Sequence, residues 1–290
     1  MSGTGAGGGS IRSAARAALP PAVWTLLRGI RLKWAAATFR RRIVEHRYGG
    51  HPLRILIADE MGRDWYDVDW PEPPVVEALR RHRLREGALV LNVGAHQGVM
   101  ALILARATGR SGRIVAVEAV PFNASLARTN RDLNDAPQIT VVHAAVGERA
   151  GVLHFNPSLN GAVEPGGAAW GRLEVQAITV DELARRHGAP DVLFMDIEGF
   201  ECRALRGAAE TLARRPDCVI EVHTGGQLES FGGSLEGILE FFPPAEFTLM
   251  MAPEWKTAES DPGCRPFNAA DDLVKRPFHL LAIGTKGATA

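Results

Sequence analysis

Short apolar runs recur along the chain after residue 87, and most are separated by segments with helical periodicity. The apolar runs predict strands at 88–93, 113–118, 138–143, 191–196, 217–222, 245–251 and 278–284. Helical patterns lie between most of them, at 98–109, 122–134, 201–213 and 234–242. Strands that alternate with helices form a parallel sheet covered on both faces. We therefore expect a Rossmann-like α/β domain over 88–290, with a mostly parallel sheet of seven strands.

Two segments depart from this alternation. The apolar runs at 245–251 and 278–284 are joined by a long loop without a clear helical pattern, which predicts an antiparallel C-terminal strand. Residues 150–178 hold two alternating segments around a stretch rich in Gly, Pro and Asn. This pattern predicts an inserted β-hairpin with a long tip at 156–171. Because long loops in compact domains are often functional, the tip is interpreted as a lid or an acceptor-binding loop.

The residues before the sheet predict a disordered tail at 1–19 and an accessory segment at 20–87. Within the accessory segment, 20–47 combines apolar positions at helical spacing with many arginines, which predicts a basic amphipathic helix. The apolar positions are Val23, Leu27, Ile30 and Trp34. Such a helix either packs on the main domain or makes peripheral contact with an anionic membrane surface or an acidic partner.

The remainder of the accessory segment predicts a strand at 53–58 and a helix at 75–84. Between them, the prolines of the stretch at 62–74 are expected to stop regular structure. This stretch also carries the aromatic residues Trp65, Tyr66 and Trp70. They either form the roof of a binding cleft or seal the edge of the core.

The chain holds 33 basic and 33 acidic residues, but residues 1–50 contain nine of the basic residues and only one acid, Glu45. The remainder has 33 − 9 = 24 basic and 33 − 1 = 32 acidic residues, a net charge of −8. This balance argues against nucleic acid as a partner. No apolar run approaches the ~20 residues of a transmembrane helix. The odd cysteine count, without a C-x-x-C motif or a clear secretory signal, makes the cytoplasm the simplest expected location.

The clearest chemical signal lies between Val90 and Glu118. An apolar strand leads into N-V-G-A-H-Q-G, then into a helical run, and then into a second strand that ends on Glu118. Gly94 and Gly98 allow a tight turn, and the helix that follows directs free N–H groups toward a ligand. A carboxylate at the end of the second strand can hold ribose hydroxyls. The segment therefore predicts a βαβ unit that binds an adenosine-containing cofactor.

The glycine spacing favours S-adenosyl-L-methionine as that cofactor. Dinucleotide folds need G-x-G-x-x-G, because a pyrophosphate must lie against bare backbone. Here the pattern is Gly94-x-x-x-Gly98, with bulkier polar residues such as His96 between the glycines. An NAD-type Rossmann oxidoreductase remains the alternative enzyme class, although the sequence shows no clear Tyr–Lys pair for hydride transfer. We also assign Ala145, at the end of the third strand, to the cofactor site.

Polar residues follow the fourth and fifth strands, where ligands bind in open α/β sheets. Asp196, Glu221 and His223 are the candidate catalytic residues, with Asp196 or His223 as the base that removes a proton from an acceptor. Together with Glu198 they could also hold a divalent metal, but a single His and loose spacing do not favour it. For Glu201 we prefer a role in charging the start of the following helix.

Four segments resemble the FkbM family of methyltransferases. They are N-V-G-A-H-Q-G, V-E-A-V-P-F-N at 117–123, I-T-V-D-E-L at 178–183 and F-M-D-I-E-G-F-E at 194–201. The resemblance implies S-adenosylmethionine-dependent methylation, usually of a hydroxyl on a sugar, glycolipid or natural product. It places Asn92, Gly94 and Gly98 in the cofactor loop, Glu118 at the ribose and Asp196 beside both cofactor and acceptor.

Two positions depart from the family pattern. Asn92 stands where the family usually has Asp, and so lacks the charge that favours the methionine ammonium. The segment Glu118–Pro121 reads E-A-V-P instead of the common E-P-x-P. A catalytically weakened cofactor-binding protein is therefore a further hypothesis. The sequence does not name the methyl acceptor.

Overall fold

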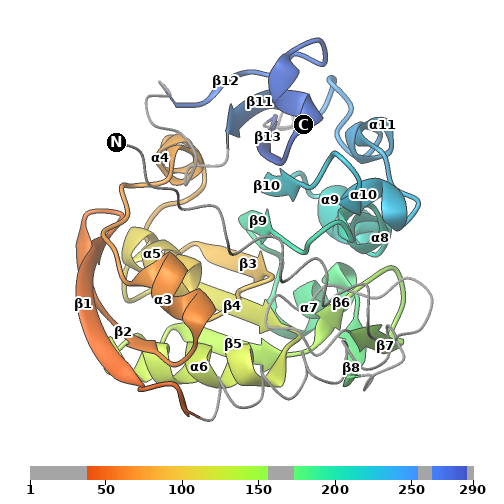
Figure 1. Cartoon of the computed structure of the whole chain (residues 1–290). Helices are drawn as coiled ribbons and strands as arrows, with labels where there is room; N and C mark the ends of the chain where they lie inside the picture. The colour runs from red at the N-terminus through yellow and green to blue at the C-terminus, as the bar shows by residue number, and fades with distance from the viewer. Residues whose placement is uncertain (1–37, 156–172, 254–262, 286–290) are drawn as a thin grey trace, which may run out of the picture.

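In the computed structural model, the described residues are 38–155, 173–253 and 263–285 (Figure 1). Their main feature is one central sheet. Its strands, in spatial order, are β12 (Arg265–Pro266), β11 (Phe247–Pro253), β13 (Phe278–Gly284), β10 (Asp217–Val222), β9 (Val192–Met195), β3 (Leu89–Val93), β4 (Arg113–Glu118) and β5 (Ile139–His143). The five strands from β10 to β5 are parallel to one another, whereas β13 is antiparallel to both β10 and β11.

All seven expected strands are present, and the antiparallel C-terminal strand is confirmed. It lies between β10 and β11, so the chain reaches the sheet edge with β11 and then returns inward with β13. The eighth strand, β12, is a two-residue addition that pairs with β11 at that edge. The short 3₁₀ helix η1 (Asp272–Lys275) precedes β13.

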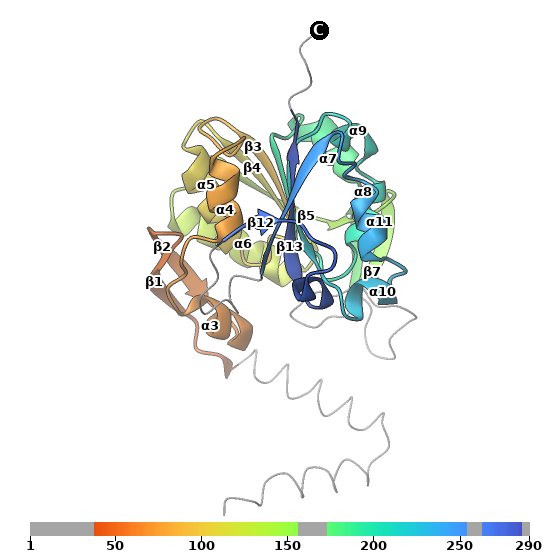
Figure 2. The same ribbon diagram turned by 90° about the horizontal axis from the view of Figure 1, so that it is seen from above.

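Helices cover both faces of the sheet, as Figure 2 shows from above. One face carries α3 (Glu60–Tyr66), α4 (Pro74–Arg80), α5 (Val99–Thr108) and α6 (Pro121–Leu133). The other carries α7 (Val180–His187), α8 (Glu201–Arg206), α9 (Ala209–Leu212), α10 (Gln227–Ser230) and α11 (Leu235–Leu239). The helix expected at 201–213 is thus divided into α8 and α9. Gly207 lies between them, where a Cβ would be 2.5 Å from the backbone oxygen of Gly147.

Alternate residues of the central strands supply a core on each face of the sheet. Val90 packs in a cluster with Leu79 of α4 and Leu102 of α5, whereas the next residue, Leu91, packs in a second cluster with Leu183 of α7. All five side chains are buried. Burial of one leucine stabilises the fold by roughly 1.5–3 kcal/mol, so both helix layers are held firmly against the strands that carry the site.

The accessory segment begins differently from the prediction. Of the helix expected at 20–47, residues up to 37 lie outside the described residues, and Arg42–Tyr48 forms strand β1. β1 pairs antiparallel with β2 (His51–Ile57) across a Gly49–Gly50 turn in which both residues have positive φ. Such a turn closes a two-residue hairpin, and this pairing decides the conformation of 42–48. The side chains of Asn130 in α6 and of Asn134, which follows that helix as its C-cap, accept hydrogen bonds from backbone N–H groups of β2.

The stretch at 62–74 was expected to lack regular structure, but its first residues belong to α3. Asp59 caps this helix by accepting a hydrogen bond from the N–H of Gly62. The prolines come later in the sequence and therefore do not interrupt α3. Tyr66 and Trp70 are 4% and 7% exposed and belong to the core. Tyr66 and Trp70 therefore seal the edge of the core.

The inserted hairpin is present as β7 (Gly151–Phe155) and β8 (Leu173–Ile178), which pair antiparallel. β8 also pairs in parallel with β6 (Ala145–Val146), so the insertion forms a three-stranded sheet beside the main one. The hairpin tip at 156–171, interpreted above as a lid or acceptor-binding loop, lies outside the described residues. Within the described residues, no helix is long and apolar enough to cross a membrane.

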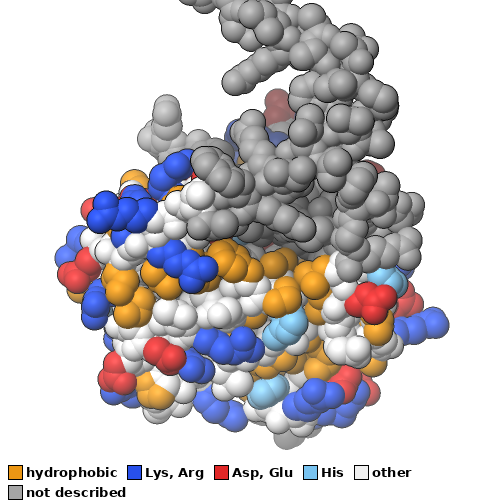
Figure 3. All heavy atoms as spheres, turned by 60° about the horizontal axis from the view of Figure 1, so that its bottom comes forward, with side chains coloured by type: hydrophobic (Ala, Val, Ile, Leu, Met, Phe, Trp, Pro, Cys, Tyr) orange, Lys and Arg blue, Asp and Glu red, His pale blue; other side chains and the backbone are white. Residues whose placement is uncertain are grey.

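Charged side chains of α6 and its surroundings pair locally. Arg131 contacts Asp132, and Arg110 contacts Asp135, both at 2.8 Å. Figure 3, which brings the lower side of Figure 1 forward, shows basic, acidic and hydrophobic side chains next to one another. Exposed pairs of this kind contribute little to stability, so the fold depends mainly on the two apolar cores.

The end of β3 approaches the end of β9 unusually closely. The N–H of Asp196 donates to the oxygen of Val93 at 2.9 Å, which brings the two chains together just beyond the strands. At Gly94, which has φ +84°, a Cβ would lie 1.7 Å from the backbone oxygen of Asp196. Only glycine therefore lets the loop after β3 turn at this point.

We expect Gly94→Ala to lower the free energy of unfolding by on the order of 3 kcal/mol, because the methyl group has no space and its neighbour is backbone. Urea unfolding followed by circular dichroism measures the change. Gly50→Ala is the matched control, since Gly50 has φ +80° but nothing within 4 Å of a Cβ. It should cost only about 1–2 kcal/mol. Equal losses in the two variants would contradict the steric argument.

Candidate functional site

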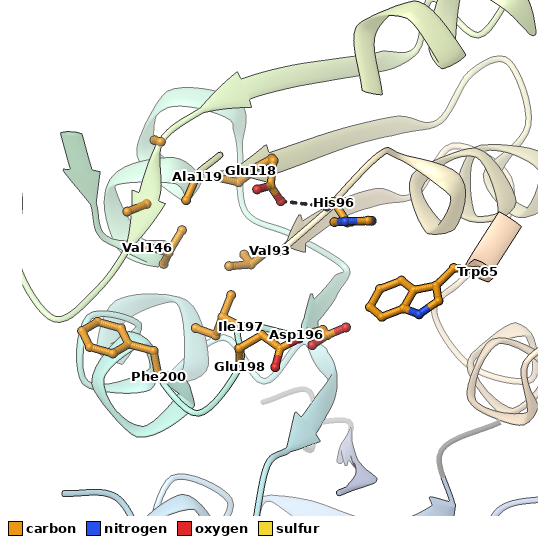
Figure 4. Close-up of a pocket in the computed structure, with 14 residues that line it drawn as sticks. Trp65, Val93, His96, Glu118, Ala119, Val146, Asp196, Ile197, Glu198 and Phe200 are labelled. Atoms are coloured by element: carbon orange, nitrogen blue, oxygen red, sulfur yellow. Dashed lines mark hydrogen bonds between the residues drawn. The ribbon is translucent and has the colours of Figure 1, made fainter. Parts of the chain in front are cut away.

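A pocket of about 660 Å³, partly open to solvent, lies at the carboxyl ends of β3, β4 and β9 (Figure 4). Its position is the one expected for a ligand in an open α/β sheet. Its lining residues are Trp65, Val93, Gly94, His96, Val117, Glu118, Ala119, Ala144, Ala145, Val146, Asp196, Ile197, Glu198 and Phe200.

Five of the residues assigned to the site from the sequence line this pocket: Gly94, His96, Glu118, Ala145 and Asp196. The other four do not line it: Asn92, Gly98, Glu221 and His223. Asn92 is 1% exposed, and its Oδ1 accepts no hydrogen bond from any described residue. A Cβ at Gly98 would lie only 3.0 Å from the Cβ of Ala127. The absence of a side chain at Gly98 therefore lets α5 approach α6 closely.

Glu118, the last residue of β4, is the buried acid of the pocket. Its Oε2 accepts a hydrogen bond from the N–H of His96, and its Oε1 accepts one from the N–H of Val120, both at 2.8 Å. Burial raises the pKa of this carboxyl, while the backbone donors favour the charged form and oppose that rise. The side chain thus braces the loop after β3 and still presents a carboxylate to the pocket.

His96 connects that loop to the accessory segment. Its φ of +48° is rare for a residue with a side chain. Its Nδ1 lies 2.5 Å from the hydroxyl of Tyr66, and its ring centroid lies 5.3 Å from that of Trp65. Burial, followed by the charges of Asp196 and Glu118, raises the pKa of Tyr66 well above the usual range. The neutral hydroxyl therefore remains available for the hydrogen bond with His96.

Apolar side chains form much of the remaining wall. Val93 lies at the centre of the close-up, Ile197 and Phe200 lie to one side of it, and the indole of Trp65 faces the pocket from the opposite side (Figure 4). Glu118 and Asp196 lie on different sides of Val93. A ligand in this pocket therefore meets an apolar surface with a carboxylate at each end. Of the three aromatic residues noted in the sequence, Trp65 alone lines the pocket.

A group of acidic residues surrounds His223 next to the pocket. We call Asp196, Glu198, Glu201, Glu221 and His223 the rim cluster. The Nε2 atom of His223 lies 3.6, 3.7 and 3.8 Å from carboxylate oxygens of Asp196, Glu198 and Glu221, respectively. The side chain of His223 is only 6% exposed, whereas that of Asp196 is 39% exposed. The topology therefore brings together all three residues predicted to be catalytic, with Asp196 nearest to solvent.

Glu201 has a different role from the one expected. Although it is the first residue of α8, its side chain is fully buried instead of charging the helix start from the surface. Its Oε1 accepts hydrogen bonds from the N–H of Gly199, at 2.9 Å, and from Nδ1 of His223, at 2.8 Å. The sequence did hold a signal for the contact between Glu201 and His223, because both residues come just after neighbouring strands, β9 and β10.

Burial disfavours protonation of His223, but the hydrogen bond to Glu201 and the carboxylates of the rim cluster outweigh it. They raise the pKa of His223 to about 10. For Glu221, burial alone would raise the pKa, but His279 and His223 lower it overall. Nε2 of His279 lies 3.3 Å from Glu221. At neutral pH Glu221 is therefore ionised and His223 carries a proton on both ring nitrogens.

A buried polar contact beside the loop after β3 was not predicted from the sequence. Nε2 of Gln97 donates to Asp59 at 2.9 Å, and both side chains are buried. The Oε1 of Gln97 has no hydrogen-bond partner among the described residues. Because Asp59 also caps α3, this contact ties the accessory segment to the loop.

Among solved structures, the chain is similar to methyltransferase FkbM from Methylobacillus flagellatus KT, with 18% identity and a TM-score of 0.43. That comparison covers 67% of this chain but only 43% of the Methylobacillus chain. A SAM-dependent O-methyltransferase from Thermotoga maritima gives 16% identity, 85% and 78% coverage, and a TM-score of 0.44. Aeropyrum pernix fibrillarin, in complex with natively bound S-adenosyl-L-methionine, gives 14% identity, 86% coverage of both chains and a TM-score of 0.43.

No curated protein matches the chain. The model of the methyltransferase FkbM domain matches residues 92–247, which is more than half of the 290 residues. The matched part begins at Asn92, includes the pocket loop and the whole rim cluster, and ends at the start of β11. The family assignment follows from this sequence match. The chain belongs to the methyltransferase FkbM domain family.

Proposed function

We propose that this protein is an S-adenosyl-L-methionine-dependent O-methyltransferase that acts on a hydroxyl of a sugar, glycolipid or natural product. The observation that carries the proposal is the placement of two carboxylates in one pocket, Glu118 at the end of β4 and Asp196 beyond β9. One can hold the sugar of a cofactor, and the other can act on an acceptor. Membership of a methyltransferase family supports the reaction class.

The residues of the pocket fit this cofactor. Glu118 ends β4 and lines the pocket, which is where a carboxylate holds ribose hydroxyls in folds of this kind. It would hold the ribose hydroxyls, while Val93, Ile197 and Phe200 offer an apolar surface to the adenine. The buried Oδ1 of Asn92 has no hydrogen-bond donor among the described residues, but Asn92 does not line the pocket, so we assign it no contact with the cofactor.

When bound, the cofactor supplies a methyl group that is already activated by its positively charged sulfur. The protein must align the acceptor oxygen with that methyl group and remove the hydroxyl proton. We assign this proton to Asp196. The new O–C bond forms as the C–S bond breaks, and the electron pair of that bond stays on sulfur. The product is a methyl ether, together with S-adenosylhomocysteine and a protonated carboxyl group.

Asp196 suits the role of base better than His223. Its side chain lines the pocket and is the more exposed of the two. His223 has a pKa raised to about 10 and therefore already carries its proton at neutral pH. It would instead stabilise the carboxylates around it, and Glu221 would share that charge.

Cofactor identity is the first test of this proposal. We expect isothermal titration to give a saturable signal with S-adenosylmethionine or S-adenosylhomocysteine and none with NAD, because the G-x-x-x-G loop leaves no bare backbone for a pyrophosphate. Incubation with methyl-labelled cofactor and a pool of hydroxylated acceptors should then transfer label. Binding of NAD alone would favour an oxidoreductase, whereas cofactor binding without transfer to any acceptor would favour a weakened enzyme.

We expect Glu118→Ala to weaken binding of S-adenosylhomocysteine by about 2 kcal/mol, which is roughly thirtyfold in Kd. The ribose hydroxyls lose a charged acceptor in this variant, and the loop at His96 loses its brace. Titration calorimetry measures the change. Glu174→Ala, at a β8 side chain that is 70% exposed, is the matched control and should leave Kd unchanged. An unchanged Kd in Glu118→Ala would contradict the placement of the ribose.

We expect Asp196→Asn to reduce kcat by about a hundredfold or more, because the amide cannot accept the acceptor's proton. The Kd for S-adenosylhomocysteine should change much less. Asp132→Asn, on the exposed side of α6, is the control for loss of one carboxylate. Parallel losses of turnover and cofactor affinity in Asp196→Asn would mean that this residue is structural.

A further inference from the structure

We propose that Asp196, Glu221 and His223 form a binding site for one divalent metal cation at the edge of the pocket. Each residue offers one ligand atom, and the three atoms lie within 4.8 Å of one another. The ligands come from two neighbouring strand ends, since Asp196 follows β9, Glu221 lies in β10 and His223 follows β10. The inference deepens the proposed function and rests on it for the identity of the neighbouring ligands.

The distances from His223 to the two carboxylates are longer than hydrogen bonds and match ligands that share an ion. Nε2 of His223 lies 3.6 Å from Asp196 and 3.8 Å from Glu221, beyond the range of an N–H···O hydrogen bond. Two atoms that each lie about 2.0–2.2 Å from one cation are separated by roughly 3–4.4 Å. Small side-chain rotations would therefore bring all three atoms to coordination distance.

The environment of His223 is that of a metal ligand. Its side chain is 94% buried, because only 6% of it is exposed, and its Nε2 is directed at the carboxylates. On the other side of the ring, Nδ1 donates to the fully buried carboxylate of Glu201 at 2.8 Å. A carboxylate on the second nitrogen of a ligating histidine fixes the tautomer and turns the free lone pair toward the metal.

The charge of the rim cluster also calls for a cation. It contains four carboxylates and one imidazole, and a second imidazole, that of His279, lies beside it at 3.3 Å from Glu221. Among the described residues, no lysine or arginine forms an ion pair with Glu198, Glu201 or Glu221. Buried or half-buried carboxylates need positive charge or hydrogen bonds to remain ionised. A divalent ion would supply that charge, and it would take the place of the proton that Nε2 of His223 otherwise carries.

The site opens toward the ligand pocket, because Asp196 and Glu198 line that pocket as well. A cation held there would face the same space as the methyl acceptor. It could bind the acceptor oxygen and lower the pKa of the hydroxyl, as cations do with bound oxygen ligands. Mixed carboxylate and imidazole ligands suit a first-row divalent ion, and Mn²⁺ is the probe of choice because its binding is directly visible by electron paramagnetic resonance.

The experiment titrates Mn²⁺ into the full-length protein, previously treated with chelator, and follows free Mn²⁺ by electron paramagnetic resonance. We expect one bound Mn²⁺ per chain. His223→Asn and Glu221→Gln should each weaken binding at least about tenfold, and Glu201→Gln by about 10–100-fold through its effect on His223. His187→Asn, at the end of α7 and far from the cluster, is the matched control and should bind Mn²⁺ like the unaltered protein.

Circular dichroism first establishes which variants are folded, and binding is compared among those. If Mn²⁺ does not bind at one site per chain, or binds equally to Glu221→Gln and His187→Asn, the proposal is overturned and His223 holds a proton only. Titration with S-adenosylhomocysteine runs in parallel on the same samples. Cofactor binding without Mn²⁺ binding overturns the metal site alone. Absence of both overturns the proposed function too.

Discussion

The close approach of two backbones, at Gly94 and Asp196, is the constraint on which the site depends. β3 and β9 are neighbours in the parallel sheet, and their ends meet where a side chain at Gly94 would overlap the oxygen of Asp196. This contact places the loop after β3 next to the acidic segment after β9. In the function that we propose, one strand end would supply the turn for the cofactor, and its neighbour would supply the group that acts on the acceptor.

Around that contact, buried polar side chains hold the loops that follow the strands in place. Glu118 fixes the backbone at His96 and Val120, while Glu201 fixes Gly199 and the ring of His223. Each carboxylate is costly to bury, and hydrogen bonds offset part of that cost. The same two side chains therefore set the shape of the pocket and its distribution of negative charge.

The accessory segment contributes to the site through packing. Its hairpin β1–β2 lies on α6, and α3 brings Trp65 and Tyr66 to the loop that contains His96. Gln97 and Asp59 connect the same two regions inside the protein. One wall of the pocket is thus built by residues that precede the sheet. A domain that began at β3 would lack the indole of Trp65 as well as the support of His96.

Much of this arrangement follows from local sequence patterns. The apolar runs predicted strand ends such as Glu118 and Val222 correctly. They could do so because a strand of a parallel sheet is buried on both faces, and its sequence is therefore almost continuously hydrophobic. The turn at Gly94 was readable because a residue without a Cβ was required there. Given the parallel order, the meeting of Asp196, Glu221 and His223 at one rim also followed, since strand ends share an edge.

Other features were decided only by tertiary structure. Arg42–Tyr48 is a strand because β2 supplies the hydrogen-bond partners that a short segment cannot provide for itself. Glu201 turned inward because His223, twenty-two positions later in the chain, offers its N–H there. The sequence of one segment shows how often its residues are buried. It was therefore enough to predict the strands, the turn at Gly94 and the residues that meet at the rim cluster. Which polar side chains are buried together depends on contacts between distant segments, and only the folded chain settles those.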